Sequence, residues 1–232
     1  MKEILKYFND LFALFFPELC AACGRSLVSN ERQICTSCIF QLPHTGFHDD
    51  PENRMARELW GRIPFEQACA FLYFRKGGKV QNLMHQLKYN KKPEAAKRAG
   101  ELYGYELKRS DKFIIPDLII PVPLHPSRLK KRGYNQSEYI AEGISLVLEI
   151  PVCSDYLSRI ENTATQTRKS RFARYENLRS AFRLKSSDLL INRHILLVDD
   201  VMTTGSTLEA CSLKLLTVEG LRISICTLAY AE

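Results

Sequence analysis

The sequence has no hydrophobic run long enough to span a bilayer, although 45% of its 232 residues are hydrophobic. A membrane-spanning helix needs about 20 consecutive apolar residues, so an integral membrane protein is excluded and no membrane insertion is expected. The apolar segment 4–16 is interrupted by Lys6, Asn9 and Asp10, and no small-residue cleavage site follows it. We therefore expect an amphipathic helix over residues 1–16 and a cytoplasmic protein. Internal repeats and low-complexity tracts are also absent.

The positive charge is concentrated in three segments, although the net charge of the whole chain is only +7. These segments are residues 75–98, 128–132 and 159–185. Clustered basic residues indicate a phosphate-rich ligand or a nucleic-acid surface. The alternative is that they are ordinary solvated faces of helices and loops.

Half of the eight cysteines form a pattern typical of a metal site. They make two Cys-x2-Cys pairs, formed by Cys20, Cys23, Cys35 and Cys38. Two tight turns of this kind present four thiolates at tetrahedral angles, which suits a structural Zn²⁺ ion. The alternatives are two disulfides, which a reducing compartment disfavours, or buried free thiols. His44 and His48 lie nearby and are further candidate ligands.

Hydrophobic patterning predicts strands that alternate with helices in the rest of the chain. Strands are expected over residues 68–74, 117–122, 152–157, 182–184, 194–198 and 222–228, and helices over residues 79–89, 93–108, 134–148 and 207–216. This alternation favours an α/β fold with a parallel sheet, whose ligand binds beyond the carboxyl ends of the strands. Residues 43–66 are polar and contain three prolines, so we expect a linker or irregular segment between regions 1–42 and 67–232.

The main functional signal follows the apolar run 194–198. Asp199 and Asp200 come at the expected carboxyl end of this strand, where carboxylates can accept hydrogen bonds from a sugar diol or steer a divalent cation. The next turn is rich in hydroxyl groups and consists of Thr203, Thr204, Gly205, Ser206 and Thr207. Backbone N–H groups and hydroxyls at the start of a helix bind phosphate. The sequence therefore predicts a site for a ribose and its 5′-phosphate; the alternative is an ordinary capped helix.

Residues 195–207 resemble the phosphoribosyl pyrophosphate (PRPP) signature of type I phosphoribosyltransferases. Segments 119–128, 131–136 and 166–182, with the cysteine pairs, are similar to the ComF family of bacterial competence-related proteins. The resemblance covers residues 16–232 and implies a type I phosphoribosyltransferase-like parallel sheet flanked by helices, with a small N-terminal four-cysteine zinc module.

The resemblance also implies roles for individual residues. Asp199 and Asp200 would bind the ribose hydroxyls, and residues 203–207 the 5′-phosphate, with Mg²⁺ bound together with PRPP. The segment that matches the pyrophosphate loop contains Leu124, His125 and Arg128, of which Arg128 would act in catalysis with the two acids. The segment that matches the mobile flap contains Arg168, Lys169 and Arg171. Lys88 lies in a segment typical of the family, but the sequence assigns it no role.

Two functions are compatible with this resemblance. The first is a phosphoribosyltransferase with an unidentified acceptor, linked to DNA uptake and natural transformation. The second is a non-catalytic PRPP-fold module that binds single-stranded DNA and a competence helicase; PRPP sensing by a regulator is a third interpretation. Purine-salvage members carry an acid where this chain has Thr203, which makes purine salvage the less expected reaction.

Overall fold

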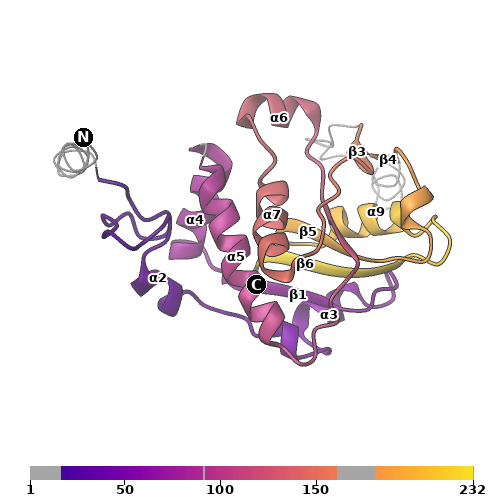
Figure 1. The fold of residues 1–232 in the computed structure, drawn as a ribbon, viewed down its shortest axis with the longest axis horizontal. Coiled ribbons are helices and arrows are strands. Elements are labelled where there is room, and N and C mark those ends of the chain that lie inside the picture. The colour runs from indigo at the N-terminus through magenta and orange to yellow at the C-terminus, as the bar shows by residue number, and fades with distance from the viewer. Residues whose placement is uncertain (1–16, 91, 161–180, 232) are drawn as a thin grey trace.

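A computed structural model describes residues 17–90, 92–160 and 181–231 (Figure 1). The main sheet has four parallel strands, in the order β1 (Ala68–Phe74), β6 (Arg222–Ala231), β5 (His194–Met202) and β2 (Leu118–Pro121). The predicted α/β class with a parallel sheet is confirmed. The helices that flank the sheet are α3 (Arg54–Leu59), α4 (Lys79–Tyr89), α5 (Pro93–Arg109), α7 (Gln136–Leu148) and α9 (Ser206–Leu215).

Helices cover both faces of the central strands. Neighbouring residues of a strand point to opposite faces, and β6 shows this directly. Cys226 lies 3.2 Å from Cys69 of β1, which accepts a hydrogen bond from Tyr103 of α5. The next residue, Thr227, contacts Met55 of α3 instead. Helices α5 and α3 therefore lie on opposite sides of the sheet, and β5 and β6 are buried between them.

Glycines allow α5 and α7 to pack unusually closely. A Cβ atom on Gly100 would lie 2.2 Å from the carbonyl oxygen of Ile140, and one on Gly143 would lie 2.0 Å from the carbonyl oxygen of Lys97. Since no real Cβ atom tolerates such distances, the two backbones approach at these positions only because the side chains are missing. This contact fixes α7, whose first residues reach the functional site.

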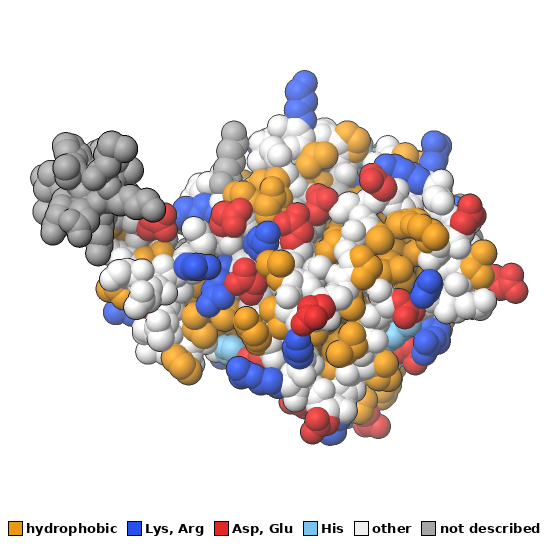
Figure 2. All heavy atoms as spheres, in the orientation of Figure 1, with side chains coloured by type: hydrophobic (Ala, Val, Ile, Leu, Met, Phe, Trp, Pro, Cys, Tyr) orange, Lys and Arg blue, Asp and Glu red, His pale blue; other side chains and the backbone are white. Residues whose placement is uncertain are grey.

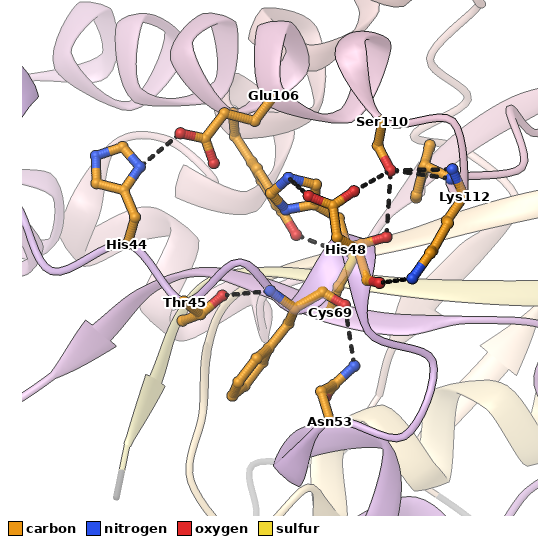
Figure 3. A network of polar contacts seen from close by, with 12 residues as sticks. His44, Thr45, His48, Asn53, Cys69, Glu106, Ser110 and Lys112 are labelled. Carbon is orange, nitrogen blue, oxygen red and sulfur yellow. Dashed lines mark hydrogen bonds and ion pairs between the residues drawn. The ribbon is translucent and has the colours of Figure 1, made fainter.

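The segment before β1 is tied to the main domain by a polar network (Figure 3). Asn53 caps α3 by accepting from the Ala56 N–H and donates to the Ala68 carbonyl of β1 at 2.8 Å. His44 contacts the carboxylate of Glu106 on α5 at 2.5 Å. Residues 43–66 thus include α3 and a short 3-10 helix (Phe47–Asp49), and they supply core side chains such as Phe47 and Met55.

The structure differs from the predicted elements at several places. Residues 152–157 do not form one strand: Val152 only bridges Ile119, and after a turn strand β3 (Leu157–Arg159) pairs with β4 (Phe182–Leu184) in a separate antiparallel sheet. Patterning also missed the short helices α2 (Thr36–Gln41) and α6 (Pro126–Arg132). The predicted helix over residues 1–16 lies outside the described residues.

None of the helices in the described ranges is both long and apolar enough to cross a membrane.

Candidate functional site

Two adjacent carboxylates lie buried near the end of β5. The side chain of Asp199 accepts hydrogen bonds from the Ser137 hydroxyl at 2.9 Å and from the Asp200 N–H at 2.8 Å. Asp200 accepts from the Gln136 amide at 2.7 Å and pairs with the Lys88 ammonium group at 3.0 Å. Both acids are at least nine-tenths buried. A side chain of α7 therefore orients each carboxylate, and Lys88 of α4 gives Asp200 a second partner.

Burial has a large effect on the ionisation of Asp199. Loss of solvent, followed by the negative charge of Asp200, raises the pKa of Asp199 to about 7. The Asp200 N–H, the Ser137 hydroxyl and the Lys88 charge act in the opposite direction but do not compensate. A carboxylic acid that titrates near neutrality in a buried site is typical of a functional position.

Helix α7 begins at these acids. Its N-cap residue Asn135 accepts from the Ser137 N–H and donates to the Val122 carbonyl at 3.0 Å, which ties the helix start to the end of β2. The positive end of the helix dipole therefore faces two carboxylates, which partly offsets the cost of their burial. Gln136 and Ser137 were not predicted as site residues, although Gln136 ends the family-like segment 131–136 and Ser137 directly follows it.

The turn after β5 forms the second part of the site. Residues 203–207 line a small hollow together with Asp199. Gly205 has a φ of 72°, and a Cβ atom there would lie 3.0 Å from both Leu59 and Met202. The turn begins α9, and the hydroxyls of Thr204 and Ser206 lie 2.9 Å apart. This arrangement of backbone amides and hydroxyls beside a carboxylate suits a phosphate on a diol-bearing sugar.

Arg62 fixes this turn from the opposite side. Its guanidinium donates to the Thr204 carbonyl at 2.9 Å and pairs with Glu209 in the first turn of α9 at 2.6 Å. The segment before β1 therefore shapes the turn after β5. Neither Arg62 nor Glu209 was predicted as part of the site.

A basic pocket lies beside the acids. Its lining residues are Lys88, Tyr89, Arg128, Lys131 and Arg132. Lys88 belongs to both features, because it lines the pocket and its ammonium group pairs with Asp200. Tyr89 is 61% exposed, and the guanidinium of Arg132 lies 6.0 Å from the centre of its ring. The pocket lining contains no acid, so it is suited to an anionic ligand.

The other predicted site residues are only partly brought together. Arg128 lies on α6 and lines the basic pocket, whereas His125 caps α6 by accepting from the Ser127 N–H at 3.2 Å. Leu124 lies in the loop between Pro121 and α6. The predicted flap residues Arg168, Lys169 and Arg171 lie outside the described residues.

The four N-terminal cysteines form a compact cluster. Their sulfur atoms all lie within 4.8 Å of one another, and Cys23 Sγ is 3.7 Å from Cys35 Sγ. Four sulfurs at about 2.3 Å from a tetrahedral Zn²⁺ are separated by about 3.8 Å, so the cluster can hold a metal ion such as zinc. Arg25 contributes positive charge beside it, and a hydrogen bond with the Cys23 side chain raises the pKa of Arg25.

The two nearby histidines have other partners. His44 contacts Glu106 through Nδ1 and the Ile39 carbonyl through Nε2. His48 Nε2 lies 3.5 Å from a carboxylate oxygen of Asp49, and its ring centroid is 6.4 Å from that of Tyr103 on α5. The cysteine cluster is the metal-ligand group found among the described residues.

Charges on the visible face of the molecule are mixed. Figure 2 shows Lys and Arg side chains interspersed with Asp and Glu side chains on this face, with hydrophobic side chains between them. The basic segments of the sequence therefore do not merge into a single positive surface on this side.

Comparison with known proteins identifies the fold and the relatives. Residues 135–232 match the phosphoribosyl transferase domain model. DNA utilization protein YhgH of Shigella flexneri is 32% identical over 85% of this chain and 84% of its own length. Competence protein F of Haemophilus influenzae is 40% identical over 51% of this chain and 53% of its own length. Among solved structures, glutamine PRPP amidotransferase from B. subtilis is 14% identical, with a TM-score of 0.43 over 62% of this chain and 30% of its own.

The parallel sheet, its flanking helices and the domain match define a protein with a phosphoribosyltransferase-type fold. The chain belongs to the ComF family of competence-related proteins. The family expected from the sequence motifs is thereby confirmed.

Proposed function

We propose that this protein binds PRPP with Mg²⁺ and transfers the phosphoribosyl group to an acceptor nucleophile, in a process linked to DNA uptake. One observation carries the proposal: two buried, oriented carboxylates are followed directly by a hydroxyl-lined turn. Asp199 and Asp200 would accept from the ribose diol, while residues 203–207 would bind its 5′-phosphate. The separation of acids and phosphate turn by only two residues matches the two ends of one pentose.

The reaction needs positioning and charge stabilisation more than covalent chemistry by the protein. A lone pair of the acceptor forms the bond to C1 of the ribose, and the bond from C1 to the pyrophosphate oxygen breaks. The electron pair leaves with pyrophosphate, and the acceptor's proton passes to solvent. Arg128 and Lys131, which line the basic pocket, would stabilise the negative charge of the leaving group. Magnesium, when bound, supplies further charge neutralisation at the pyrophosphate.

Pyrophosphate release is the test of turnover. Purified protein with PRPP and Mg²⁺ is assayed against a panel of bases, amines and nucleic acids. The proposal predicts release that depends on one class of acceptor and falls by about 100-fold or more in Arg128→Ala. Release from no member of the panel, with PRPP binding intact, would favour a binding module.

The basic pocket favours a second function, the binding of single-stranded DNA. Exposed Tyr89, with Arg132 beside its ring, combines a surface for base stacking with charges for phosphates. A helicase partner is implied by the family resemblance alone. DNA binding that falls steeply with salt, survives Asp199→Ala with Asp200→Ala and weakens in Tyr89→Ala would support this function. Insensitivity to Tyr89→Ala would oppose it.

We also propose that the four cysteines hold a structural zinc ion. The ligand set is complete without an open position, as in closed structural sites. The cluster packs against α4, since the Asn82 side chain donates to the Ala22 carbonyl at 3.3 Å. The zinc would fix the two cysteine turns, the first of which contains Ala22.

A further inference from the structure

Lys88 occupies the boundary between the acid pair and the basic pocket. Its ammonium group lies 3.0 Å from the carboxylate of Asp200, and the same side chain lines the pocket with Arg128 and Lys131. The Lys88 side chain is 22% exposed, whereas that of Asp200 is 7% exposed. The lysine therefore has one buried anionic partner in this structure and faces a second place where an anion would bind.

The position of Lys88 is fixed by the surrounding elements. The Tyr134 hydroxyl, just before α7, donates to the Leu87 carbonyl in the last turn of α4. This contact joins the helix that carries Lys88 to the helix start that carries Gln136. Gln136 and Lys88 both bind the same carboxylate oxygen, Oδ2 of Asp200. That oxygen consequently already has two donors before a sugar hydroxyl reaches it.

We propose that Lys88 is a positioning residue that blocks Asp200 in the free protein and is displaced onto the diphosphate of PRPP when the sugar binds. The inference rests on the proposed function. The ribose diol then donates to Asp200 in place of the ammonium group, and the ammonium group moves toward the anion in the basic pocket. Both charges of the broken ion pair acquire new partners, but only when the ligand brings a diphosphate.

This exchange makes Lys88 a specificity determinant. Breaking an ion pair with a buried carboxylate is costly unless the separated charges are compensated. Ribose 5-phosphate has the diol and the 5′-phosphate but no diphosphate, so it would have to displace Lys88 without compensation. The wild-type protein should therefore discriminate against ribose 5-phosphate more strongly than the missing diphosphate contacts alone require.

The test measures two ligands on the same variants. Dissociation constants of PRPP and of ribose 5-phosphate, each with Mg²⁺, are determined by calorimetry at pH 8.5 for the wild type, Lys88→Met and Lys130→Met. Lys130 is the matched control, because it is an exposed lysine of α6 outside the pocket lining. Lys88→Gln replaces Lys88→Met if the latter does not fold.

The proposal predicts opposite shifts in the Lys88 variant. Ribose 5-phosphate should bind about tenfold more tightly because the block is gone, and PRPP about tenfold or more weakly because a cation is lost. Lys130→Met should leave both constants within about twofold. A parallel loss of both affinities, as a merely structural role requires, or no change in either, would overturn the role of Lys88. If the wild type binds neither PRPP nor ribose 5-phosphate, the proposed function is overturned, and with it the proposal that Lys88 blocks Asp200.

Discussion

At the scale of single residues, the acids of β5 show a conflict between stability and function. Burial and the neighbouring Asp200 raise the pKa of Asp199 to about 7, so the folded protein holds this proton more tightly than the unfolded chain does. The stability gained from the bound proton is complete below the unfolded pKa, near 4, and is lost as the pH rises through 7. Above pH 7 the ionised Asp199 therefore destabilises the fold.

Replacement of Asp199 by Asn should reveal this cost. The variant removes the buried charge but keeps an oxygen for Ser137, so its free energy of unfolding should exceed that of the wild type at pH 8. The excess should shrink by on the order of 2 kcal/mol at pH 5, where the wild-type side chain is protonated. Chemical denaturation of both proteins at pH 8 and at pH 5 measures this difference in the free energy of unfolding. If Asp199→Asn is less stable than the wild type at pH 8, the buried charge of Asp199 does not destabilise the fold, and this explanation is wrong.

A second titrating residue, His44, should also make the fold less stable as the pH rises, through its ion pair with Glu106. The hydrogen bond to Glu106 raises the pKa of His44 against the effect of burial. Its stabilising contribution is present below the unfolded pKa of about 6.5 and is lost as the pH rises through the folded value. Glu106→Gln should cost about 1 kcal/mol at pH 6 and less at pH 9. The exposed Asp155→Asn serves as the control, and an equal cost of Glu106→Gln at both pH values would exclude this ion pair as its cause.

At the scale of elements, the close contact of α5 and α7 controls the position of the site. Gly143→Ala places a Cβ atom 2.0 Å from the Lys97 carbonyl oxygen, and a backbone carbonyl cannot rotate away as a side chain can. Alanine favours a helix by about 1 kcal/mol over glycine, but the forced separation of the helices should outweigh this gain.

The expected net loss is about 1–3 kcal/mol in the free energy of unfolding, with weaker PRPP binding because α7 carries Gln136 and Ser137. Leu146→Ala, on the exposed side of the same helix, should change both quantities little. Thermal denaturation measures the stability of the two variants, and titration with PRPP measures their affinity for the ligand. An unchanged or raised melting temperature for Gly143→Ala would show that the helices can move apart freely.

The elements also explain which parts of the site the sequence could predict. Asp199, Asp200 and residues 203–207 lie within one short stretch of the chain, so one strand, one turn and one helix start place them together whatever the rest of the chain does. The partner of Asp200 on α7 is 64 residues away, and the Arg62 that fixes the turn is 142 residues from Thr204. Local patterning contains no information on such pairs. Helix α6 was missed because its seven residues contain no buried side chain.

At the scale of the whole molecule, the cysteine cluster and the acid pair are separate features joined through α4. The helix contacts the cluster through Asn82 near its start, and it carries Lys88 in its last turn. We therefore expect the proposed zinc to stabilise the N-terminal part without taking part in the proposed reaction.

Metal analysis tests this separation. Cys38→Ser should lose the zinc that the wild type retains after purification in reducing buffer, while Cys153→Ser should keep it. PRPP affinity should change by less than about threefold in Cys38→Ser, because no cysteine of the cluster contacts the acids. Metal-free wild-type protein, or loss of PRPP binding together with the metal, would contradict the assigned structural role.

The central claim is that the turn after β5 binds an activated pentose by its diol and its 5′-phosphate. Calorimetric titration of PRPP with Mg²⁺ into the wild type and into the double variant Asp199→Ala with Asp200→Ala tests it most directly. The account predicts saturable binding by the wild type and a loss of about 100-fold or more in the double variant, which should remain folded with its metal content unchanged. Equal PRPP affinity in the two proteins would show that the sugar binds elsewhere.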